Sequence, residues 1–137
     1  MAGELLLDTG AFVALIDRSE ERHRDCVQVL EQWSGPILTS EAVLTEALHL
    51  LGPGWRPRRA CLDFILRGAV LLVPSSLESL RRVTELMEKY ADRPMDFADA
   101  TLVALAEDLN ADQIFTLDRG DFSIYRLQGK RPFRILP

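Results

Sequence analysis

Two groups of aspartates stand at the ends of one segment in the last third of the chain. Asp96 and Asp99 open an apolar, helix-length segment, whereas Asp118 and Asp121 follow the short apolar run 113–116. If that run is a strand ending where the helix begins, the two groups converge. Because converging carboxylates repel one another, and a metal ion is the usual remedy, this spacing indicates a metal site.

Two acids from the first third of the chain can complete the group. Asp8 ends the apolar run 4–8, and Glu46 lies early in a helix that follows the short apolar run 37–39. In parallel α/β sheets, ligands bind beyond the carboxyl ends of the strands, at the switch point of the topology. We therefore expect Asp8, Glu46, Asp99 and Asp118 to reach one edge of the sheet.

Four carboxylates in one cleft suit hard, oxygen-binding ions such as Mg²⁺ or Mn²⁺. Such an ion can lower the pKa of a water molecule and clamp a scissile phosphate, so the expected reaction is phosphodiester hydrolysis with a water nucleophile. The sequence contains no P-loop, G-x-G-x-x-G, G-x-S-x-G or H-E-x-x-H motif. With only two histidines, a ribonuclease mechanism based on a histidine pair is poorly supported.

Each acid also has a purely structural interpretation. Asp8 could cap a helix that starts near Gly10, and Glu46 could be an ordinary exposed helix residue. We assign Asp96 to capping, with Asp99 as its partner in the first turn.

The second aspartate group and two threonines leave further alternatives open. Asp118 and Asp121 could be turn residues of the DRGD segment. Because Asp118 lies nearer the predicted strand, we favour it as the ligand and keep Asp121 as the alternative fourth ligand. Thr9 and Thr116 flank the site and could hydrogen-bond a carboxylate or a water molecule.

The acidic balance of the chain argues against non-specific nucleic-acid binding. The net charge is −5, yet arginines cluster at Arg56, Arg58 and Arg59 and again at 81–82, so local patches for phosphate contact are possible. The N-terminal residues resemble no signal peptide, and no apolar run approaches a membrane span. The two cysteines lack metal-ligand spacing and indicate buried free thiols in a reducing compartment, which places the protein in the cytoplasm.

Short apolar runs alternate with helical patterns along the 137 residues, which fits one α/β domain with helices on both faces of a mainly parallel sheet of four or five strands. A capping box is predicted at Ser75–Glu78, and Pro94 is predicted to precede the helix that carries Asp99. The expected strands are 4–8, 37–39, 69–73, 113–116 and an edge strand at 133–136. The expected helices are 11–16, 20–33, 41–51, 56–67, 77–90 and 96–109.

Four segments together resemble the PIN-domain ribonucleases, and most closely the VapC-type toxins of toxin–antitoxin pairs. They are DTGAFVALID, SEAVLTEAL, MDFADATLVALA and IFTLDRGDF, and the resemblance extends from Leu5 to Phe122. It implies a three-layer α/β/α PIN-like domain over residues 1–137. It also implies an acidic quartet at Asp8, Glu46, Asp99 and Asp118, with Thr9 as the hydroxyl residue after the first aspartate.

The resemblance further implies an activity and partners. The chain would be a Mg²⁺- or Mn²⁺-dependent endoribonuclease that cuts RNA, such as tRNA or rRNA. It would form a homodimer and be inhibited by a cognate antitoxin that lies in the active-site groove. One rival is a catalytically idle PIN-like binding module. Another is a receiver-type signalling domain, which needs an adjacent acidic pair after the first strand, where this chain has only Asp8.

Overall fold

The sheet of this protein is built from short, buried strands, as the apolar runs predict. The computed structural model describes residues 3–93 and 95–137, so Pro94, predicted to precede a helix, lies outside the described residues. The strands are β1 (Leu5–Leu7), β2 (Ile37–Ser40), β3 (Leu71–Val73), β4 (Gln113–Phe115), β5 (Arg126–Leu127), β6 (Arg131–Pro132) and β7 (Arg134–Leu136). The helices are α1 (Thr9–Ile16), α2 (His23–Gln32), α3 (Glu41–Leu50), α4 (Trp55–Leu66), α5 (Leu77–Lys89), α6 (Phe97–Leu109) and α7 (Arg119–Phe122).

Five strands form one sheet in the order β3-β2-β1-β4-β7, and every pairing in it is parallel. The chain builds outward from β1 to β3, then crosses to the other side of β1 to add β4 and β7. The direction therefore reverses between β1 and β4, which is the switch point where ligands bind in such folds.

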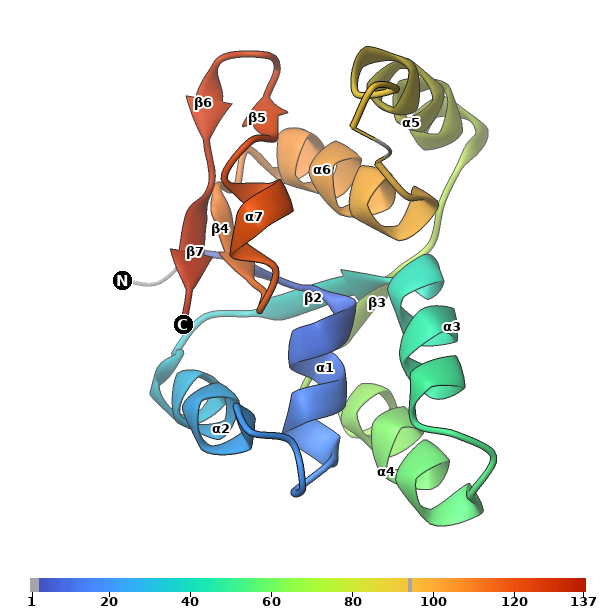
Figure 1. Ribbon diagram of the computed structural model, residues 1–137, viewed down its shortest axis with the longest axis vertical. Helices are drawn as coiled ribbons and strands as arrows, with labels where there is room; N and C mark the ends of the chain where they lie inside the picture. The colour runs from blue at the N-terminus through green and yellow to red at the C-terminus, as the bar shows by residue number, and fades with distance from the viewer. Residues whose placement is uncertain (1–2, 94) are drawn as a thin grey trace.

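Helices cover both faces of the sheet, which confirms the predicted α/β architecture with a mainly parallel sheet (Figure 1). Helices α1, α2 and α4 lie on one side, and α5 and α6 on the other. Helix α3 stands near the end of the strands and contacts both α1 and α6. The three leucines of β1 are fully buried, so the central strand is apolar on both faces, as parallel sheets require.

A serine side chain caps the start of α3. The Ser40 hydroxyl accepts a hydrogen bond from the Val43 N–H and caps the helix. After α3 and α4, Gly52 and Gly68 adopt φ values of +83° and +82°, which residues with a side chain rarely adopt.

Other local predictions were wrong. The capping box at the start of α5 joins Ser76 and Ser79, one position later than Ser75–Glu78. β3 begins at Leu71 rather than at Ala69, and it is an edge strand in which Leu71 is 47% exposed. The short helix α7 and the β5–β6 hairpin were not predicted. Among the helices that the structure describes, none combines the length and apolarity needed to cross a bilayer.

Candidate active site

The switch point between β1 and β4 positions the first acid. Leu7 pairs with Phe115, so the next residues, Asp8 and Thr116, lie side by side. The Thr116 hydroxyl donates a hydrogen bond of 2.7 Å to Asp8 Oδ2 and accepts one of 2.9 Å from the Asp118 N–H. Asp8 occupies the cap position of α1, but its side chain makes no capping bond to the helix. Its carboxylate is therefore directed by β4 rather than used to start α1.

The start of α6 positions the second acid. The Asp96 side chain accepts a hydrogen bond of 2.7 Å from the Asp99 N–H, which confirms its predicted capping role. Asp99 lies in the first turn of α6 and is buried. Its Oδ2 accepts a hydrogen bond of 3.0 Å from the Tyr125 hydroxyl.

Helix α7 adds the last two aspartates. Asp118 is exposed and caps α7, because its Oδ1 accepts a hydrogen bond of 3.0 Å from the Asp121 N–H. One carboxylate oxygen each from Asp99, Asp118 and Asp121 lies within 4.8 Å of the others. Asp121 also pairs with Arg93, whose Nε lies 3.1 Å from its Oδ1.

One open pocket collects these groups. The structure thus brings all four predicted quartet residues together, with Asp121 beside them, while their roles as ligands remain a prediction. Thr9 also lines this pocket, and its buried hydroxyl has no hydrogen-bond partner among the described residues. The residues that line the pocket are Asp8, Thr9, Gly10, Glu46, Leu50, Asp96, Asp99, Leu117, Asp118 and Asp121.

Burial and mutual repulsion make these acids hard to ionise. Burial, followed by the charges of Asp8 and Asp96, raises the pKa of Asp99 to about 8, although the Tyr125 hydrogen bond opposes the shift. Burial likewise raises the pKa of Asp8 to about 6, against the hydrogen bond from Thr116. Burial also raises the pKa of Asp118, which the charge of Arg93 partly offsets. Without a cation in the pocket, Asp99 is therefore largely protonated at neutral pH.

The donor set fits a hard divalent cation. The site offers only oxygen atoms, which are the ligands of Mg²⁺ and Mn²⁺. Buried hydroxyls are normally hydrogen-bonded. The unpartnered Thr9 hydroxyl is therefore an independent indication that a further polar group binds at this site.

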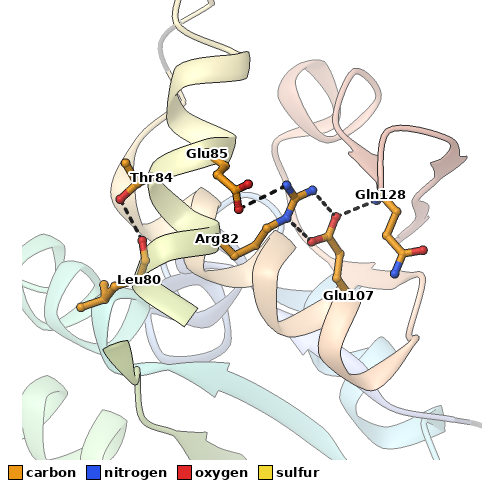
Figure 2. Close-up of polar contacts among 6 residues, drawn as sticks. All are labelled: Leu80, Arg82, Thr84, Glu85, Glu107 and Gln128. Carbon is orange, nitrogen blue, oxygen red and sulfur yellow. Dashed lines mark hydrogen bonds and ion pairs between the residues drawn. The ribbon is translucent and has the colours of Figure 1, made fainter. Parts of the chain in front are cut away.

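None of the predicted arginines lines the acidic pocket in the part of the chain that the structure describes. Arg58 donates to the Gly52 carbonyl at 2.7 Å, and Arg59 pairs with Asp63 at 3.0 Å. Arg82 is held by Glu107 through two hydrogen bonds, as Figure 2 shows, so its guanidinium is already occupied. Of the two neighbouring arginines 81 and 82, only Arg81 therefore stays a candidate for phosphate contact.

Sequence reasoning missed two residues that contact the acids, Tyr125 and Arg93. Tyr125 lies 26 residues from Asp99 and Arg93 lies 28 residues from Asp121, so no helical or strand spacing relates the partners. The apolar environment of Tyr125 in SIYRL gave no sign of a polar contact either.

Comparison with known families identifies the family of the chain. The family model of the PIN domain matches residues 5–127, and the chain belongs to that family. A search of curated proteins found no match.

Several solved structures share the fold. The toxin VapC20 of Mycobacterium tuberculosis, described as cleaving the sarcin–ricin loop, is similar with a TM-score of 0.78 at 21% identity over 85% of this chain and 91% of that one. VapBC2 of Rickettsia felis, bound to a promoter DNA fragment, gives 0.70 at 16% identity over 98% and 99%. A toxin–antitoxin complex of Klebsiella pneumoniae gives 0.65 at 20% identity over 88% and 91%. At these identities the likeness concerns the fold.

Proposed function

We propose that this chain is a metal-dependent endoribonuclease and the toxin of a type II toxin–antitoxin pair. The observation that carries the proposal is the convergence of Asp99, Asp118 and Asp121 oxygens within 4.8 Å, in a pocket that Asp8, Glu46 and the unpartnered Thr9 hydroxyl also line. Membership of the PIN family supports it. The same membership removes the receiver-type alternative, whereas the idle binding module remains to be tested.

The residues of the pocket have distinct tasks in this proposal. Asp8, Glu46, Asp99 and Asp118 would hold a Mg²⁺ or Mn²⁺ ion, with Asp121 as the alternative fourth ligand. Such an ion would supply an activated water and polarise the phosphodiester. Thr116 orients Asp8 through its 2.7 Å hydrogen bond. The Thr9 hydroxyl has no partner among the described residues and is available for a hydrogen bond.

The similar proteins support a proposal for the substrate and the partners. VapC20 is described as cleaving the sarcin–ricin loop, so RNA such as tRNA or rRNA is the proposed substrate, with Arg56, Arg58 and Arg59 as proposed phosphate contacts. Two similar structures are toxin–antitoxin complexes, which supports a cognate antitoxin as partner. We further propose that residues 1–137 act as one domain, that the protein is a homodimer and that it works in the cytoplasm.

Metal binding and cleavage test the proposal separately. Mn²⁺ should raise the melting temperature of the wild type but not that of Asp8→Asn. Incubation with total RNA and Mn²⁺ should give cleavage that falls by on the order of 10²–10³-fold in Asp99→Asn, as when one group of a preorganised electrostatic site is removed. Either substitution should relieve growth inhibition on expression. Metal binding without any cleavage would favour the idle module, and cleavage that survives Asp99→Asn unchanged would refute the site.

A further inference from the structure

Tyr125 makes the only side-chain hydrogen bond to the Asp99 carboxylate within residues 3–93 and 95–137. We propose that Tyr125 is a positioning residue for the metal site, and this inference rests on the proposed function. Its hydroxyl donates to Asp99 Oδ2 at 3.0 Å, which fixes the orientation of the carboxylate group that would hold the cation. Groups that hydrogen-bond a ligating carboxylate set its orientation and thereby tune the affinity for metal.

The ring of Tyr125 is held rigidly enough for this task. The residue is fully buried. Its ring packs edge to face on Tyr90, with centroids 5.1 Å apart, and on Phe122 at 5.2 Å. Phe122 packs in the same way on Phe133 at 5.6 Å. Aromatic neighbours at these distances restrict the ring, so the hydroxyl reaches a single place.

Tyr125 also joins the two groups of acids. Its backbone N–H donates a hydrogen bond of 3.1 Å to the Asp121 carbonyl at the end of α7, while its side chain reaches Asp99 in α6. A single residue therefore fixes the spacing between the helix that carries Asp99 and the turn that carries Asp118 and Asp121.

The residues that follow are tied down as well. The Arg126 N–H donates to the Tyr90 hydroxyl at 3.0 Å. The Gln128 N–H donates to Glu107 Oε2 at 2.6 Å, and Arg82 holds Glu107 from the other side, as Figure 2 shows. The backbone that follows Tyr125 is thus hydrogen-bonded to Tyr90 at the end of α5 and to Glu107 in α6.

Removal of the Tyr125 hydroxyl tests the inference directly. The loss of free-ion electron paramagnetic resonance signal on titration with Mn²⁺ gives the dissociation constant without any RNA. Tyr125→Phe should weaken Mn²⁺ binding by about tenfold to a hundredfold, as for other groups that orient metal ligands. The matched control is Tyr90→Phe, which removes a hydroxyl from the same aromatic group but one that accepts from a backbone N–H. It should cost comparable thermal stability and leave Mn²⁺ affinity little changed.

A second background separates positioning from general loosening of the fold. Asp99→Asn should lower Mn²⁺ affinity by itself, and adding Tyr125→Phe to it should cause little further loss. The same loss in both backgrounds would refute positioning through Asp99, as would wild-type affinity in Tyr125→Phe. A wild type that does not bind Mn²⁺ would overturn the proposed function and this inference together, whereas normal binding in wild type and Tyr125→Phe alike would overturn only the inference.

Discussion

Helix α6 carries two carboxylates in opposite electrostatic situations. Near its end, the Glu107 side chain is only 8% exposed and receives hydrogen bonds from Arg82 Nε, Arg82 Nη2 and the Gln128 N–H. Burial by itself would raise the pKa of Glu107, but these contacts outweigh it and lower the pKa below the ordinary value. At the start of α6, Asp99 is also buried, yet it accepts a single side-chain hydrogen bond and faces other acids.

The difference between Glu107 and Asp99 indicates that the acidic pocket is a functional site. The fold can pair a buried carboxylate fully, since it does so for Glu107 within the same helix. Asp99 is left without a basic partner and its pKa rises to about 8, which costs folding free energy whenever the group is ionised. A stability cost concentrated at one pocket is typical of a functional site, and here a ligand cation would offset it.

The largest expected effect is on the pH dependence of the metal-free protein. The folded pKa values of Asp99 and Asp8, about 8 and about 6, exceed the ordinary value of 3.8. Between pH 3.8 and about 8 the folded state binds more protons than the unfolded state, so the free energy of unfolding falls as pH rises. The contribution of these groups is complete below pH 3.8 and is lost as pH rises through about 8. It should reach a few kcal/mol, on the order given by such shifts.

Urea unfolding in EDTA from pH 5 to pH 9 measures this fall. In Asp99→Asn the fall should be much smaller, and the variant should be more stable than the wild type at pH 8. Saturating Mn²⁺ should flatten the wild-type profile, because the ion favours the ionised acids. A wild-type stability that rises over this range would show that Asp99 is paired as Glu107 is, and the contrast between the two acids would disappear.

Neutralising the acid at the other end of α6 should lower the stability of the protein, whereas Asp99→Asn should raise it at pH 8. Glu107→Gln removes the charge from a largely buried pair and should lower the free energy of unfolding by about 1–3 kcal/mol at pH 7. The value stays below that of a fully buried pair because Arg82 remains 35% exposed. Urea unfolding of the wild type and of Glu107→Gln at pH 7 measures this change in the free energy of unfolding.

Glu85→Gln is the matched control for this substitution. Its carboxylate also faces Arg82, but at 3.9 Å and with the side chain 66% exposed. Exposed pairs contribute little, so a change within about 0.5 kcal/mol is expected. Equal losses for Glu85→Gln and Glu107→Gln would mean that burial does not distinguish the two partners.

The sequence was sufficient for the acids that follow regular elements. Asp8 lies just past a short apolar strand, and Asp96 and Asp99 occupy the cap and first turn of a strongly apolar helix. In these places local spacing determines position, so the pocket could be predicted from strand ends and helix starts. The fold class followed from the same alternation of elements.

The contacts that adjust the site were not accessible in this way. Tyr125 meets Asp99 through the path of α7 and the hairpin, which are too short to show a hydrophobic period. The partners of Glu107 lie 25 and 21 residues away in sequence and depend on how α5 and the hairpin pack on α6. The start of the capping box was also ambiguous in the sequence, because Ser75 and Ser76 are both serines followed by plausible partners.

The smallest expected effect concerns Arg93, which pairs with Asp121 of the acidic pocket and was not predicted. Its pair with Asp121 is half-exposed, at 46% and 34%, so it contributes little to stability. It does occupy an oxygen of Asp121, which is one of the two candidates for the fourth metal ligand. If Asp121 binds the ion, Arg93 competes with it, and removing the pair should tighten Mn²⁺ binding by about two- to fivefold, equivalent to at most ~1 kcal/mol.

Two substitutions distinguish competition from long-range repulsion. Arg93→Gln removes both the charge and the hydrogen bond to Asp121, whereas Arg93→Lys keeps the charge but not the guanidinium Nε donor. Tighter Mn²⁺ binding in both variants would assign Asp121 as a ligand. Tighter binding in Arg93→Gln alone would reflect charge repulsion and favour Asp118, leaving Asp121 as an internally paired acid of the same kind as Glu107.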